Sequence, residues 1–135
     1  MLFCGDTLFA CGCGRLFEGT PAQMSASLSK FAALPGETLV FCTHEYTLSN
    51  IRFALAVEPD NLKLQAWSRA AAQLRASNAP TLPTTIAHEL EVNPFMRCHQ
   101  PSVLQAAQRV AGSTGSSLSS PADVLAVIRA WKDRF

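Results

Sequence analysis

The sequence predicts an α+β fold, in which short strands come first and helices follow. Residues 1–45 contain short runs of aromatic and β-branched side chains separated by glycine-containing turns, which is typical of strands. From Glu45 onward, every periodic segment has helical spacing instead. This change predicts two parts, residues 1–45 and residues 46–135, of which the second is all-helical.

The strands are expected at both ends of the first part. Two strand-like pieces lie within residues 2–11, on either side of a turn at Gly5-Asp6. Residues 11–14 (Cys-Gly-Cys-Gly) are too rich in glycine for a helix interior, so a loop should follow them. Residues 38–43 form an apolar, β-branched run after a turn, which predicts a buried strand with His44 at its end.

Capping residues mark the first two helices. Residues 20–23 (Thr-Pro-Ala-Gln) form a capping box with proline at the first helical position, and the helix should end near Pro35-Gly36. Asp60 is expected to cap a second helix, whose apolar stripe runs from Leu64 to Leu74.

Three more helix starts are expected in the second part. Thr85 should begin a short helix through Leu90, and Ser102 should cap the next one together with Gln105. A Gly/Ser-rich loop over residues 112–120 precedes the last helix, which Ser120-Pro121 opens.

Composition excludes several classes of protein. The chain has 135 residues, of which 48% are apolar and 16% charged, so we expect it to fold. Its 11 basic and 10 acidic residues argue against a dedicated nucleic-acid binder. No apolar run approaches the roughly 20 residues of a membrane helix, and the start does not resemble a signal peptide. The five cysteines are an odd number at irregular spacing, which predicts a reducing cytoplasm rather than a disulfide framework.

Two residues are candidate metal ligands. Asp6 and His44 both follow apolar runs, and a carboxylate and an imidazole at strand ends suit a metal such as zinc. The alternative is structural, because an Asp after Gly often forms a turn and a single His is often an ordinary structural side chain. A thiolate site built on Cys11 and Cys13 does not fit the usual C-x₂₋₄-C spacing, so these cysteines are interpreted as small buried side chains.

Two cations on the last helix are candidate anion ligands. Arg129 and Lys132 are three residues apart beside an apolar stripe, and such a pair can hold a carboxylate. A solvated helix face gives the same pattern, and on spacing alone that simpler interpretation is favoured.

Several motifs together resemble the hydroxyacylglutathione hydrolases, also called glyoxalase II. The resemblance spans essentially the whole chain and includes the closing Arg129-x-x-Lys132-Asp133. The motifs are Gly5-Asp6-Thr7-Leu8-Phe9, Gly12-Cys13-Gly14-Arg15-Leu16-Phe17-Glu18-Gly19-Thr20, Thr43-His44-Glu45-Tyr46-Thr47-Leu48-Ser49-Asn50 and Asn93-Pro94-Phe95-Met96-Arg97.

The resemblance implies a fold and a reaction. Residues 1–45 would be the end of a metallo-β-lactamase-like αβ/βα domain, and residues 46–135 an all-helical glutathione-binding domain. The family uses two divalent metal ions, zinc or else iron or manganese, to hydrolyse S-(2-hydroxyacyl)glutathione to glutathione and a 2-hydroxy acid, which detoxifies methylglyoxal.

The resemblance also implies a role for each site residue. Asp6 would be the catalytic carboxylate that bridges the two metal ions, and His44 would be a ligand of one of them. The positions that hold glutathione would be Arg15, Phe17, Tyr46, Arg129 and Lys132. Phe17 stands where other members have tyrosine, so a hydroxyl contact is in doubt there.

The family's His-x-His-x-Asp-His motif does not occur in this sequence. Because Asp6 and His44 are only two of the expected ligands, we expect this chain alone to bind no metal stably and to be inactive. We also expect its first strands to leave one apolar face uncovered. Three interpretations stay open: an inactive part of a hydrolase, a non-catalytic glutathione-binding module, and a helical interaction domain that pairs with a separately encoded N-terminal half.

Overall fold

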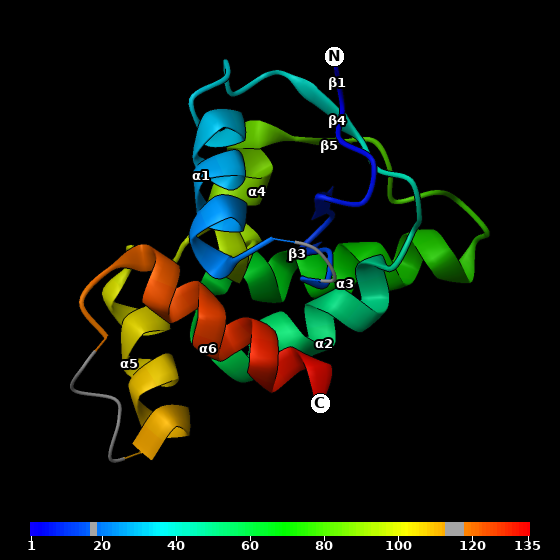
Figure 1. Ribbon diagram of the computed structural model, residues 1–135. Coiled ribbons are helices and arrows are strands. Elements are labelled where there is room, and N and C mark those ends of the chain that lie inside the picture. The colour runs from blue at the N-terminus through cyan, green and yellow to red at the C-terminus, as the bar shows by residue number, and fades with distance from the viewer. Residues whose placement is uncertain (17–18, 113–117) are drawn as a thin grey trace.

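The computed structural model describes residues 1–16, 19–112 and 118–135. Within these ranges it is a mixed α+β structure, as predicted, and no helix there is long and apolar enough to cross a membrane. Figure 1 shows the elements, which are β1 (Leu2–Phe3), β2 (Leu8–Phe9), β3 (Gly12–Cys13), α1 (Pro21–Ala32), β4 (Leu39–Phe41), α2 (Thr47–Val57), α3 (Leu62–Ala76), β5 (Thr84–Thr85), α4 (Ile86–Val92), the 3₁₀ helix η1 (Pro94–Met96), α5 (Pro101–Ala111) and α6 (Pro121–Asp133).

A small sheet joins the beginning of the chain to its middle. Its strand order is β1-β4-β5, with β1 parallel to β4 and β5 antiparallel to β4. Val40 at the centre of β4 is fully buried, whereas Phe3 and Leu39 are exposed on the other side. β5 makes one exception to the expectation that residues 46–135 are all-helical. The proposed division at residue 45 stays a prediction.

A second, two-stranded sheet is the β2–β3 hairpin. Its first strand, β2, was predicted together with β1, but β3 and the pairing of β2 with β3 were not. Leu8 pairs with Cys13 and Phe9 with Gly12, so Ala10 and Cys11 form a two-residue turn, and Cys11 has a positive φ of 61°. Gly14 follows the hairpin where a Cβ would lie 1.9 Å from the Asp6 carbonyl oxygen, so only glycine fits there.

Polar side chains of the helices hold this hairpin in place. Asn50 donates to the Ala10 carbonyl at 3.1 Å, and Asn93 donates to the Gly12 carbonyl at 3.0 Å. Glu89 accepts from the Cys11 N–H at 2.8 Å, and burial raises the pKa of this carboxyl to about 7. Buried backbone groups need such partners, so the hairpin depends on residues that lie far away in the sequence.

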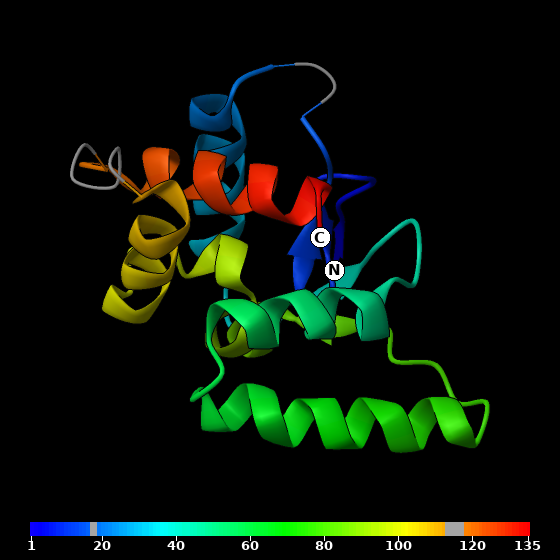
Figure 2. The same cartoon turned by 90° about the horizontal axis from the view of Figure 1, so that it is seen from below.

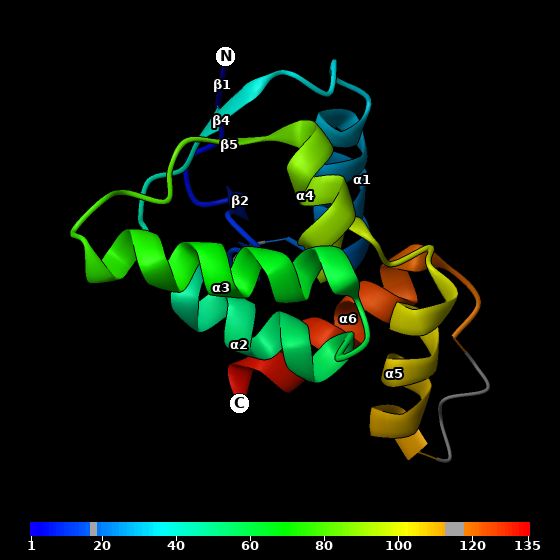
Figure 3. The ribbon, with the colours of Figure 1, turned by 180° about the vertical axis from the view of Figure 1, so that it is seen from behind.

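The helices surround the hairpin. α1 packs against α6, α2 against α3, and α5 against α6. Figure 2, seen from below, shows α2 and α3 side by side, and Figure 3 shows α3 running across the back of the molecule. The main core gathers side chains from both predicted parts, among them Leu8, Val40, Phe53 and Ile128.

Several predicted helix starts are confirmed. Thr20 and Gln23 form the reciprocal capping box of α1, Thr85 caps α4, and Ser120 caps α6. α2 was not predicted individually, because its N-cap Tyr46 makes no side-chain capping bond and therefore gives no capping signal.

Two predicted caps are wrong by one or two residues. α3 is capped by Asn61 rather than Asp60, since the Asn61 side chain accepts from the Leu64 N–H at 3.2 Å. α5 follows Gln100, because Pro101 occupies its first turn, where the prolyl ring fits a helix start. Ser102 therefore lies inside α5. Most of the predicted 112–120 loop falls outside the described residues.

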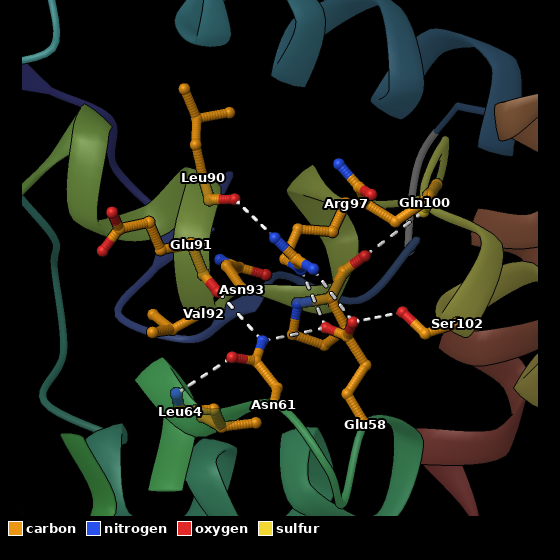
Figure 4. A network of polar contacts seen from close by, with 12 residues as sticks. Glu58, Asn61, Leu64, Leu90, Glu91, Val92, Asn93, Arg97, Gln100 and Ser102 are labelled. Carbon is orange, nitrogen blue, oxygen red and sulfur yellow. Dashed lines mark hydrogen bonds and ion pairs between the residues drawn. The ribbon is translucent and has the colours of Figure 1, made fainter. Parts of the chain in front are cut away.

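A polar network ties the end of α2 to the start of α5 (Figure 4). Glu58 is buried and receives two hydrogen bonds from Arg97, at 2.8 and 3.0 Å, and one from the Ser102 hydroxyl at 2.5 Å. Burial opposes ionisation of Glu58, but the bonds from Arg97 and Ser102 outweigh it and hold its pKa below the ordinary value. The carboxylate is therefore charged and fully paired.

Candidate functional site

Asp6 and His44 lie at neighbouring strand ends. β1 and β4 are parallel neighbours, so the loops after them leave the same edge of the sheet. His44 Nε2 lies 4.0 Å from Asp6 Oδ1, and both side chains are more than half exposed. The imidazole ring also stacks on the Tyr46 ring, with centroids 5.2 Å apart. The structure thus brings together the two predicted metal ligands and leaves them open to solvent.

These two residues line a cavity of about 560 Å³. Other lining residues come from the hairpin and from the C-terminal end of α6, and the α6 residues are far from Asp6 in the sequence. Of the predicted residues, all except Phe17 line it, and Phe17 lies outside the described residues. The lining residues are Asp6, Phe9, Cys13, Gly14, Arg15, His44, Tyr46, Ser49, Asn50, Arg129, Lys132 and Phe135.

Arg129 is buried in the cavity wall, and most of its donors are already used. Its Nη1 donates to the Cys13 carbonyl at 2.6 Å, and its Nε and Nη2 donate to Asp133 at 3.2 and 2.9 Å. Only 4% of the residue is exposed. The solvated-face interpretation is therefore wrong for Arg129, which clamps α6 onto the hairpin and adds positive charge to the cavity from behind its surface.

Lys132 lies one turn further along α6 and is less completely paired. Its ammonium group donates to Asn50 Oδ1, and the Asn50 amide is held by the hairpin. Burial lowers the pKa of Lys132 to about 8, and the adjacent Arg129 charge adds to this effect. Its charge is disfavoured by its surroundings, so an anion in the cavity would stabilise it.

Arg15 and Tyr46 are the most accessible of the predicted glutathione-binding residues that the structure describes. Arg15 Nε lies 3.7 Å from Asp133 Oδ1, and 62% of the arginine side chain is exposed. Tyr46 is also half exposed and packs against Phe9, with ring centroids 5.4 Å apart. Both side chains are therefore free to meet a ligand that enters from solvent.

The cavity has the charge to attract an anion, but its described residues do not form a metal site. Three cationic side chains line it, together with one carboxylate. Across residues 1–16, 19–112 and 118–135, no group of three or more His, Cys, Asp or Glu side chains is placed to hold a metal ion. His88 and His99 are elsewhere; His88, for example, packs against Trp67. The metal-ligand roles of Asp6 and His44 stay predictions.

Asn50 lines the cavity but was not among the predicted site residues. It is buried and joins Lys132 to the hairpin turn, and Gly12 is glycine because a Cβ would lie 2.7 Å from the Asn50 amide nitrogen. The signal was available, since Asn50 follows Tyr46 by four residues and so lies on the same face of a helix. This spacing is informative only if residues 47–57 are recognised as a helix.

Comparison with known proteins identifies the family of this chain. A family model described as "Hydroxyacylglutathione hydrolase C-terminus" matches residues 45–135. Proteins named hydroxyacylglutathione hydrolase are 60% identical in Cupriavidus taiwanensis, 57% in Pseudomonas aeruginosa strain LESB58 and 54% in Nitrosomonas europaea. The matches cover 99%, 100% and 99% of this chain but only 49%, 51% and 50% of those relatives.

The chain thus spans about half the length of the curated relatives it matches. The family model covers its second part, and the relatives extend the similarity over its first strands as well. The chain belongs to the hydroxyacylglutathione hydrolase family.

Proposed function

We propose that this chain supplies the glutathione-binding wall and two metal ligands of a hydroxyacylglutathione hydrolase. Residues 1–45 would be the end of its metallo-β-lactamase-like domain, and residues 46–135 its helical glutathione-binding domain. The reaction hydrolyses the thioester of an S-(2-hydroxyacyl)glutathione to glutathione and a 2-hydroxy acid. The observation that carries this proposal is that Asp6 and His44 share one cavity with Arg15 and Lys132.

The cationic wall suits the tripeptide part of such a substrate. Glutathione carries two carboxylates. The Lys132 ammonium can attract one as a compact positive charge, and the planar Arg15 guanidinium can bind the other through two hydrogen bonds. Tyr46 offers a ring and a hydroxyl beside them. Arg129 would act mainly by positioning, because its bonds to Cys13 and Asp133 fix the wall that presents Lys132.

Asp6 and His44 would hold metal ions on the other side of the cavity. Two divalent ions, zinc or else iron or manganese, would supply an activated water molecule and charge stabilisation when bound. Asp6, through its two carboxylate oxygens, would be a ligand of both ions, and His44, whose ring stacks on Tyr46, would be a ligand of one of them. The thioester would then lie between this pair and the cationic wall.

The remaining ligands must come from outside the described residues. We therefore propose that hydrolysis requires the region that precedes the matched part in the relatives, and that the chain alone binds no metal stably. The five free cysteines, of which four are buried, are consistent with a reducing cytoplasm.

Complementation tests this proposal. The chain is mixed with the preceding half of the Cupriavidus taiwanensis relative and with zinc, and hydrolysis of S-lactoylglutathione is followed. We expect turnover only in the mixture, and a fall of about 100-fold or more in kcat for Asp6→Asn. Asp60→Asn is the matched control, because Asp60 is exposed and does not line the cavity.

Two results would overturn the proposal. Turnover by the chain alone with zinc would show that its own residues complete the metal site. A stable mixture that binds glutathione but does not hydrolyse the thioester would show that the cavity serves binding only.

A non-catalytic interaction module is the second candidate, and the uncovered sheet face favours it. Met1, Phe3 and Leu39 are 81%, 73% and 39% exposed, and the Phe3 ring stacks on Phe41 with centroids 5.2 Å apart. An apolar face of this kind needs a covering layer. Since the relatives are twice as long, the occupant would be their remaining half, supplied as a separate polypeptide.

Co-purification separates the two candidates. A complex that is weakened by Phe3→Ser and shows no hydrolysis would support the module alone. Failure of the two halves to associate would exclude it.

A further inference from the structure

Parallel pairing of β1 with β4 brings two cysteines together. Leu2 is in register with Val40 and Phe3 with Phe41, and the next pair in this register is Cys4 with Cys42. Hydrogen bonds from Cys4 N to Phe41 O at 3.4 Å and from Thr43 N to Gly5 O at 3.3 Å continue the pairing beyond them. The two thiols therefore occupy facing positions on the same side of adjacent strands.

The spacing of these positions suits a disulfide. Neighbouring strands lie about 4.8 Å apart, which is inside the range of about 4.4–6.8 Å found between the Cα atoms of disulfide-bonded cysteines. Because the backbone spacing already falls within this range, formation of a bond requires only a local side-chain movement.

The buried thiols, that of Cys4 included, contact groups of the protein; Cys4 donates to the Leu8 carbonyl at 3.1 Å. Cys11 donates to the Val92 carbonyl, Cys98 to the Pro94 carbonyl, and Cys13 receives a contact from Arg129. All three are buried, whereas Cys42 is only partly buried. An oxidant in solution can therefore reach Cys42 before any other thiol of this chain.

We propose that Cys4 and Cys42 form a reversible intramolecular disulfide. One cysteine of the pair loses its proton, attacks a small-molecule disulfide, forms a mixed disulfide and releases the first small thiol. The other cysteine then attacks the sulfur of the first and releases the second small thiol. The cysteine pair loses two electrons and two protons, which reduce one small-molecule disulfide to two thiols.

The position of this bond gives it a consequence for the site. Cys4 and Cys42 each precede a candidate metal ligand by two residues, Asp6 and His44. A disulfide joins the two strand ends that carry these ligands and fixes their separation. This consequence rests on the proposed function, whereas formation of the bond does not.

Peptide mapping tests the proposal. The reduced chain is incubated with hydroxyethyl disulfide, remaining thiols are blocked, and the chain is digested without reduction. We expect a linked Cys4–Cys42 peptide whose mass is about 2 Da lower than the sum of its two reduced peptides, and full reversal by dithiothreitol. Cys98→Ser is the matched control and should keep the link, while Cys42→Ser should lose it.

Three results would overturn the proposal: five intact thiols, a stable mixed disulfide on Cys42, or links that involve Cys11, Cys13 or Cys98. A parallel incubation with oxidised glutathione shows whether the cavity assists the reaction. Because hydroxyethyl disulfide has no carboxylates, the link should form with it even if the cavity does not bind glutathione. Calorimetric titration of the reduced chain with glutathione tests cavity binding separately.

Discussion

Two regions of this molecule hold a positive charge in partly buried surroundings, and they do so differently. In the network of Figure 4, Arg97 meets the Glu58 carboxylate through two hydrogen bonds, so that each charge has an opposite partner. At the cavity, Lys132 meets the neutral amide oxygen of Asn50 and lies beside a second cation, Arg129. In the first region the positive charge is paired with a negative one, and in the second it is not.

This difference indicates that the Glu58–Arg97 pair stabilises the fold, whereas Lys132 is available to bind a ligand. A buried charge costs free energy unless an opposite charge and hydrogen bonds offset the loss of water. Glu58 and Arg97 satisfy each other and join three helical segments, so a ligand would have nothing to add there. Lys132 is held in a position where a ligand carboxylate would supply its missing partner.

Arg97→Met removes the Glu58–Arg97 ion pair and should have the largest effect of these substitutions on stability. It leaves the Glu58 carboxylate buried without its ion pair, which should lower the free energy of unfolding by about 3–5 kcal/mol. Urea denaturation measures this loss. Arg109→Met, at an exposed position on α5, is the control and should change the free energy of unfolding by less than about 0.5 kcal/mol. A similar effect of both substitutions would contradict the comparison.

Lys132→Met should have the opposite pattern. Removing the ammonium group takes away the charge that faces the cavity, so the affinity for glutathione should fall about tenfold or more in calorimetric titration. The free energy of unfolding should stay unchanged or rise, because a partly buried charge is removed as well. The exposed Lys63→Met is the matched control. Loss of stability without loss of affinity would show that Lys132 is structural.

The pH dependence of binding sharpens the same point. Burial lowers the pKa of Lys132 to about 8, so this side chain loses its proton as the pH rises through that value. Affinity for S-methylglutathione, which has no thiol to titrate, should therefore fall as the pH rises through about 8. Lys132→Met should lack this step.

Stability should respond in the other direction. Between pH 8 and the ordinary lysine pKa of 10.5, the unfolded chain binds a proton at Lys132 that the folded chain does not bind. The contribution of Lys132 to the free energy of unfolding should therefore rise between pH 8 and pH 10.5. A fall in both affinity and stability would indicate general unfolding instead of titration of Lys132.

The sequence alone predicted the elements whose signals are local. The Thr20–Gln23 capping box, Ser120 before Pro121, and the apolar strand before His44 each depend on neighbouring residues, and the structure contains all three elements. Asp6 and His44 followed from the same kind of evidence, and the structure places them 4.0 Å apart.

What the sequence did not predict depends on distant contacts. β3 and the turn before it have a glycine-rich sequence that resembles a loop, and the β2–β3 hairpin is held by side chains from distant segments, namely Asn50, Glu89, Asn93 and Arg129. Likewise, helical spacing placed Arg129 and Lys132 near each other, but it did not show that Arg129 points into the protein. Only the packing of α6 on the hairpin distinguishes the clamping arginine from the lysine that faces the cavity.

Arg15→Ala should give the smallest effect and completes the comparison. The Arg15 side chain is 62% exposed and lies 3.7 Å from Asp133, so water and salt screen its charge. Affinity for glutathione should fall about twofold to threefold at low ionic strength, and this difference should disappear at about 0.5 M salt. Arg69→Ala, at an exposed position on α3, serves as the control. A loss of affinity that persists in high salt would show that Arg15 contacts the ligand where water is excluded. In that case the ligand would supply an opposite charge to two partly buried cations, Arg15 and Lys132, instead of to Lys132 alone.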